Sequence, residues 1–114
     1  MKSFEEIVKP FQEQLNKVNY KKIDAQTDPT VYLFQKWAYR VGKNWYGFDL
    51  AGVPFIWAQI IDRFLEEVQK ECPDFEIHQV KLKFGGNRTY LGNINDKLLQ
   101  NSHDFLINFL ANDD

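Results

Sequence analysis

Residues 53–73, VPFIWAQIIDRFLEEVQKECP, decide the fold of this chain because they carry its strongest periodic pattern. Apolar residues recur there at steps of three and four, which predicts an amphipathic helix. Pro54 suits the first helical turn, and Pro73 predicts that the helix stops at Cys72. The charged residues of the other face are expected to be solvated rather than to form a general acid and base pair. The apolar stripe comprises Val53, Ile56, Trp57, Ile60, Ile61, Phe64, Leu65 and Val68, and the polar face comprises Asp62, Arg63, Glu66, Glu67 and Lys70.

A β-hairpin is predicted directly after this helix. Residues 75–84 and 88–91 alternate apolar and polar side chains, and the segment GGN lies between them. Glycine reaches the positive φ angles that a tight reversal needs, so this segment is expected to form the turn.

The N-terminal segment also has helical spacing. Ser3 and Glu6 match a capping box, and apolar residues follow at helical steps as far as Val18. Pro10 falls inside this pattern, so the helix either kinks at Pro10 or begins there. Near the other end of the sequence, Leu98 to Leu110 repeat the pattern of an amphipathic helix.

The segment between the first two helices, VYLFQKWAYRVGKNWYGFDLAG, is rich in aromatic and β-branched residues. This composition favours strands, so residues 31–41 and 45–50 are interpreted as another hairpin, the first of the two along the chain, with GKN at its turn. A helix over VYLFQKWAYR is the alternative. The whole sequence, 1–114, is therefore expected to form a single α+β domain in the order α-ββ-α-ββ-α, with an antiparallel sheet of two hairpins and three helices packed on it.

Composition limits the function classes. The net charge is −2, too small for bulk attraction to nucleic acid or to an anionic membrane. Cys72 is the single cysteine, the N-terminus lacks the apolar run of a signal peptide, and no stretch reaches the roughly 18 apolar residues of a membrane span. A cytoplasmic protein without membrane contact is the resulting expectation.

No catalytic, cofactor or metal signature is present in the sequence. The soft metal ligands His78, His103 and Cys72 do not have the spacing of a zinc site. Cys72, at a helix end before proline, is interpreted as an inert thiol rather than a nucleophile. We therefore expect neither an enzyme nor a bound cofactor or metal.

Three aromatic residues, Tyr46, Phe48 and Phe55, fall outside every apolar face that can be drawn from the pattern. Aromatic side chains anchor protein interfaces, so these three, together with Trp45, are the predicted partner-binding residues. Packing in the core is the alternative, and burial against a second copy of the chain is a further one.

The second hairpin provides a different candidate site. Lys81 and Lys83 alternate along one predicted strand, and Arg88 and Tyr90 lie on the other. Clustered cations with an aromatic ring can bind a nucleic acid strand, whereas the alternative is a solvated hairpin face.

The segment from Trp57 to Leu91 resembles a pattern in small uncharacterised proteins of phages and bacteria, in which a helix precedes a strand reading Lys-x-Lys-Phe-Gly-Gly-x-Arg-x-Tyr. Leu82 and Asn87 depart from this pattern, and the C-terminal cysteines that such proteins often have are missing here. The resemblance implies a helix and hairpin unit and a phage or mobile-element context, but no mechanism. The matching residues are Lys81, Lys83, Phe84, Gly85, Gly86, Arg88 and Tyr90.

These observations together favour a small protein-binding module that inhibits or neutralises a partner, as an immunity protein does. The alternative is a nucleic-acid binder that uses the basic hairpin.

Overall fold

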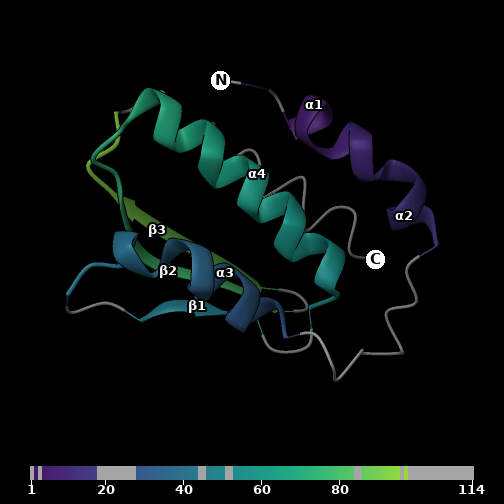
Figure 1. Cartoon of the computed structure of the whole chain (residues 1–114), viewed down its shortest axis with the longest axis horizontal. Helices are drawn as coiled ribbons and strands as arrows, with labels where there is room; N and C mark the ends of the chain where they lie inside the picture. The colour runs from purple at the N-terminus through teal and green to yellow at the C-terminus, as the bar shows by residue number, and fades with distance from the viewer. Residues whose placement is uncertain are drawn as a thin grey trace.

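The computed structural model describes residues 2, 4–17, 28–43, 46–50, 53–83, 86–95 and 97, and at positions 4, 82, 83 and 86–89 it describes the backbone. Helices pack on a three-stranded sheet (Figure 1), so the predicted α+β class is confirmed. The helix expected over 98–110 lies outside the described residues. No helix in the described part of the chain is long and apolar enough to span a membrane.

The predicted central helix is confirmed as α4, Phe55–Glu71. Every residue of its apolar stripe is buried, and Trp57, Ile60 and Val68 have no exposed surface. Asp62 and Glu67 are buried too, contrary to the expectation that they face solvent. The buried surface of α4 is wider than its apolar stripe because α4 contacts both α3 and α1.

The N-terminal helix is kinked at Pro10, which was one of the two alternatives. It consists of α1, Phe4–Val8, a 3-10 turn η1, Lys9–Phe11, and α2, Gln12–Asn16. A proline inside a helix removes a backbone donor, and the chain tightens into the 3-10 turn at this point. Ile7 and Val8 are buried, and α1 contacts α4.

The first predicted hairpin is wrong, because residues 29–37 form a helix, α3, Pro29–Trp37. Asp28 is its N-cap, with Oδ1 accepting a hydrogen bond of 2.8 Å from the backbone N–H of Thr30. Pro29 occupies the first turn, where no donor is required. A 3-10 turn, η2, Ala38–Arg40, follows, and among the described residues of the predicted hairpin only β1, Gly47–Asp49, is a strand.

The second predicted hairpin is confirmed as β2, Glu76–Lys83, and β3, Gly86–Gly92, which pair antiparallel. The predicted GGN turn is too long, because Gly86 and Asn87 already belong to β3 and pair with Lys83 and Leu82. The prediction of a wholly antiparallel sheet is wrong, because β1 pairs parallel with β2 and the strand order is β1-β2-β3. The reason is the crossover: α4 connects β1 to β2 and returns the chain in the same direction, which a tight turn cannot do. Val41 also makes a parallel bridge to Ile77.

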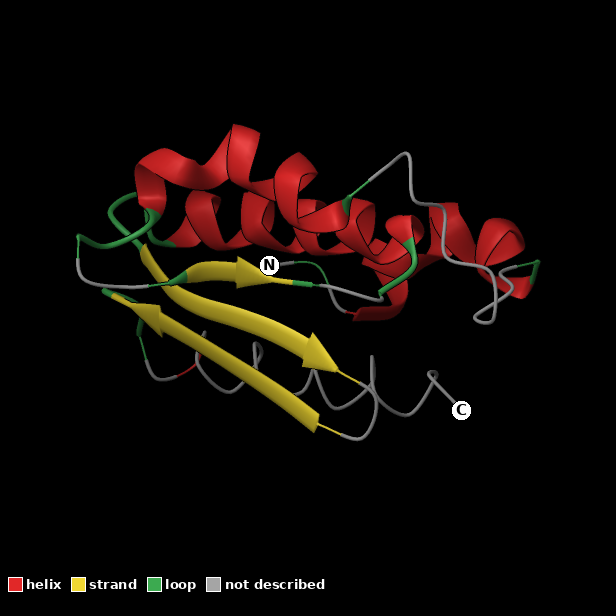
Figure 2. Cartoon of the chain, turned by 90° about the horizontal axis from the view of Figure 1, so that it is seen from below, coloured by secondary structure: helices red, strands yellow, loops and turns green. Residues whose placement is uncertain are grey.

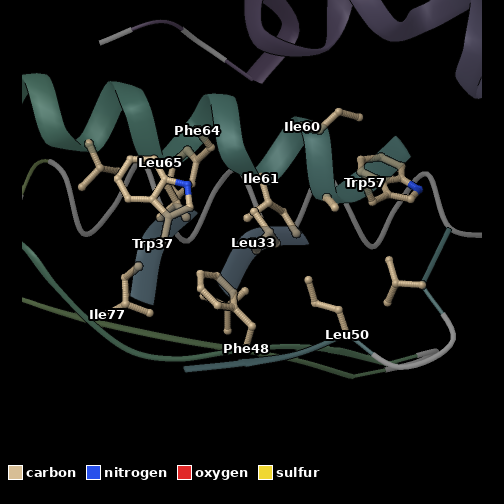
Figure 3. Packing of buried hydrophobic residues seen from close by; sticks show 14 of the residues in the cluster. Leu33, Trp37, Phe48, Leu50, Trp57, Ile60, Ile61, Phe64, Leu65 and Ile77 are labelled. Atoms are coloured by element: carbon tan, nitrogen blue, oxygen red, sulfur yellow. The ribbon is translucent and has the colours of Figure 1, made fainter. Parts of the chain in front are cut away.

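The hydrophobic core lies between the sheet and the helices. Helices α3 and α4 cover the same face of the sheet (Figure 2). Trp37 of α3 lies between Phe64 of α4 and Ile77 of β2, and Leu33 lies between Ile61 of α4 and Phe48 of β1 (Figure 3). All six side chains are buried.

Candidate functional site

The four predicted partner-binding residues do not form one surface. Phe48 is only 6% exposed and belongs to the core, whereas Tyr46, two positions earlier, is 81% exposed. Phe55 is partly buried and packs edge-on against Tyr32, with the ring centroids 5.0 Å apart. Trp45 lies outside the described residues. Of the predicted patch, Tyr46 is therefore the clearly exposed member.

Further exposed apolar side chains come from α3, the helix that contacts β1. Val31 is 50% exposed and Phe34 is 47% exposed, and they lie three positions apart on the helix. A methyl group at Gly47 would lie 3.7 Å from Cε2 of Phe34, so the Phe34 ring sits beside the backbone that follows Tyr46. We call Val31, Phe34 and Tyr46 the α3–β1 surface.

The sequence interpretation missed Val31 and Phe34 because it placed both residues in a strand. On a helix, positions 33 and 37 lie on one face, and positions 31 and 34 lie on another. Leu33 and Trp37 fill the core, which leaves Val31 and Phe34 outside it. The signal that could have found them is Asp28-Pro29, an N-cap followed by a first-turn proline.

A buried carboxylate joins α3 to α4. Asp62 is 4% exposed, and its Oδ1 accepts a hydrogen bond of 2.8 Å from the indole Nε1 of Trp37. The ammonium group of Lys36 lies 2.9 Å from Asp62 Oδ1 and also donates to Glu66. The buried Asp62 carboxylate is thus paired with two donors, Trp37 and Lys36, and both belong to α3. The role of Asp62 is therefore to hold α3 and α4 together.

The surrounding charges respond to this arrangement. Burial disfavours the charged forms of Lys36 and Glu66, but the hydrogen bonds and the attraction of the opposite charges together outweigh burial. Those from Lys36 to Glu66 and Asp62 raise the pKa of Lys36, and those that Lys36 and Arg63 donate to Glu66 lower the pKa of Glu66. Both residues therefore stay ionised over a wider range of pH than they would in an unfolded chain.

A groove of about 500 Å³ lies between α1 and α4. Ile7 and Phe11 contribute apolar surface, while Glu66 pairs with Arg63 at 3.2 Å and Glu67 pairs with Lys70 at 3.3 Å. These carboxylates and cations already satisfy one another, so the groove offers no convergent set of free polar groups from these four residues. The remaining lining residues are Lys2, Glu6 and Pro10.

The register of the hairpin brings the predicted nucleic-acid-binding positions together. Lys81 is paired with Arg88, Gln79 with Tyr90, and Lys83 with Gly86. Positions two apart on a strand share a face, so Lys81, Lys83, Arg88 and Tyr90 occupy one face of the β2–β3 ribbon. Tyr90 is 51% exposed, and Lys81 is half-buried.

The remaining reactive side chains are dispersed. Cys72 is partly buried against the core, and His78 lies 3.3 Å from Glu76. His103 lies outside the described residues. Within the described ranges, no three His, Cys, Asp or Glu side chains are grouped so that they could hold a metal ion.

Comparisons of this chain with protein-family models, with curated proteins and with solved structures give no match.

Proposed function

We propose that this protein is a protein-binding domain that docks on its partner through the α3–β1 surface. The observation that carries the proposal is the exposure of Val31 and Phe34 on α3 and of Tyr46 in the chain segment beside Phe34, while Phe48 is buried in the core. Exposed aromatic side chains that lie together on a rigid scaffold are the usual anchors of a protein interface.

The position of this surface also supports a protein partner. β1 is an edge strand of the described sheet, and α3 lies directly beside it. Large apolar side chains gain free energy from losing contact with water, and a protein can cover them with apolar groups of its own. The nucleic acid backbone offers charge instead, for which this surface has no matching set of cations among its three members.

The test is a pull-down that compares the unmodified chain with Phe34→Asp and Tyr46→Asp as bait. Tyr90→Asp is the matched control, since Tyr90 is an exposed aromatic residue on the opposite edge strand, β3. Circular dichroism and thermal melting establish that each variant is folded. We expect one protein to be retained at high salt by the unmodified chain and by Tyr90→Asp, and to be lost from the other two baits.

Equal retention of that protein by all four baits would contradict the proposal. Loss of a homodimer in Phe34→Asp, measured by light scattering, would identify a second copy of the chain as the occupant of the surface. If a partner is retained, its activity is measured with and without the chain. Loss of activity supports the inhibitory, immunity-type role that we assign to the docking, and unchanged activity contradicts that role.

Nucleic-acid binding by the β2–β3 ribbon is the second candidate, favoured by the register that pairs Lys81 with Arg88. An aromatic ring on a basic strand pair suits the stacking of bases on a single strand. The expected result is binding of a single-stranded oligonucleotide that weakens steeply with salt and further in Lys81→Gln and Tyr90→Ala. Binding that depends on neither residue would reject this candidate.

A further inference from the structure

Arg40, the last residue of η2, occupies an aromatic site at the end of the helical layer. Its guanidinium carbon lies 5.0 Å from the ring centroid of Tyr39 and 5.0 Å from that of Phe75. Both contacts have the geometry of a cation over a ring face. The site therefore joins η2 to the residue that precedes β2.

The two rings are themselves held in place. The Tyr39 hydroxyl donates a hydrogen bond of 2.9 Å to Oε1 of Gln69 on α4, and its ring stacks on Trp37 at an interplanar angle of 15°. Phe75 is 1% exposed and meets the Trp37 ring edge-on at 5.8 Å. Arg40 thus rests on one ring that is buried in the core, Phe75, and on a second, Tyr39, that is 67% exposed but held by its hydrogen bond and its stacking on Trp37. These contacts limit the entropy that the Arg40 side chain would lose on binding.

This cation has no acidic partner among the described residues. Lys36, Arg63 and Lys70 each pair with a carboxylate, but no carboxylate in the described part of the chain pairs with Arg40. Its Nε is buried and has no hydrogen-bond partner. Arg40 as a whole is half-buried, so the terminal amino groups, rather than Nε, are the donors that a ligand can reach.

We infer that Arg40 is a carboxylate-binding site, at which the two terminal amino groups of the guanidinium donate parallel hydrogen bonds to one carboxylate. A planar, fixed guanidinium fork suits a bidentate carboxylate better than it suits a single-atom anion. Arg40 also lies close to the docking surface. Val41, the residue after Arg40, is packed beside Gly47, the residue after Tyr46: a methyl group at Gly47 would lie 3.3 Å from Val41 Cγ2. The carboxylate is supplied by an Asp or Glu side chain of the protein partner, an assignment that rests on the proposed function.

The test follows the arginine side-chain resonances of the full chain by NMR during titration with sodium acetate. Sodium chloride at equal ionic strength corrects for screening, and Arg63, already paired with Glu66, is the internal control. Arg40→Lys and Arg63→Lys assign the signals. We expect a saturable shift of the Arg40 signal with half-saturation at roughly 10–100 mM, the range of a single charge-assisted pair.

A shift of Arg40 no larger than that of Arg63, or an equal shift in chloride, would overturn the site. A parallel titration with inorganic phosphate separates the two sources of an oxyanion: tighter binding of phosphate than of acetate would overturn the assignment to an acidic side chain. Neither titration uses the docking partner, so failure of the α3–β1 surface leaves the result unchanged. In Phe34→Asp the Arg40 response to acetate is expected to remain.

Discussion

At the scale of single residues, Asp62 is a charged residue of α4 that is buried where α4 packs against α3. A buried carboxylate is stable only with hydrogen-bond donors or cations around it, and Trp37 and Lys36 supply both. Neither partner is near Asp62 in the sequence, so the helical pattern alone assigned Asp62 to the solvated face. The Trp37 indole is buried as well, so its N–H group depends on Asp62 as a hydrogen-bond acceptor.

Asp62→Ala is expected to lower the free energy of unfolding by about 1–3 kcal/mol, since it leaves the buried indole N–H without an acceptor. Asp62→Asn, which keeps an acceptor, should cost less than Asp62→Ala. Urea denaturation of both variants, combined in a double-mutant cycle with Trp37→Phe, measures the coupling. Zero coupling between positions 37 and 62 would contradict the assigned bond.

Acid should weaken the fold through Glu66. The folded pKa of Glu66 is lowered below 4.5, so its contribution is present above that pH and is lost as the pH falls through the folded pKa. The side chain is 35% exposed, so screening by water limits the effect to at most about 1 kcal/mol. Denaturation of Glu66→Gln between pH 7 and pH 3 should have a shallower pH dependence than the unmodified chain, and identical slopes would reject this role.

At the scale of elements, α3 shows where composition misleads. Aromatic and β-branched residues favour strands on average, but Asp28 is an N-cap and Pro29 stands in the first helical turn. Leu33 and Trp37, four positions apart, would share one face of a strand as well as of a helix, so their spacing does not distinguish the two. The capping residue and the proline therefore favour the helix against the average β propensity of the segment.

Asp28→Ala should destabilise the protein by about 1 kcal/mol, because it removes the side chain that accepts from Thr30 N–H at the helix N-terminus. Asp28→Ser is the matched control, since serine is also a good N-cap and should retain most of the stability. Chemical denaturation midpoints of the two variants give the comparison. A strand over this segment would make both substitutions nearly neutral.

At the scale of the whole molecule, the mixed sheet determines which aromatic residues are exposed and so available to a binding partner. The crossover through α4 makes β1 parallel to β2, and β1 then directs Phe48 against the helical layer. Tyr46 precedes the strand and remains outside. Two residues that the sequence placed in one interface are thereby divided between core and surface.

Phe48→Ala is expected to cost about 3–5 kcal/mol, the usual range for removal of a buried phenylalanine side chain, while Tyr46→Ala should change stability by less than about 0.5 kcal/mol. Thermal and urea unfolding of the two variants measure this contrast directly. Similar losses in both would mean that Tyr46 packs in the core. A small loss in Phe48→Ala would return Phe48 to the candidate interface.

The sequence by itself determined α4, marked Pro10 as the point where the N-terminal helix either kinks or begins, and determined the β2–β3 ribbon. Each of these depends on residues that are neighbours in the chain: a 3.6-residue period, a missing backbone donor, and a two-residue alternation interrupted by glycines. Only the tertiary structure decided the parallel partner of β1, the burial of Asp62 and the exposure of Phe34. Those outcomes depend on contacts between segments far apart in the sequence, where the free energy of burying one side chain determines which other side chain stays in water.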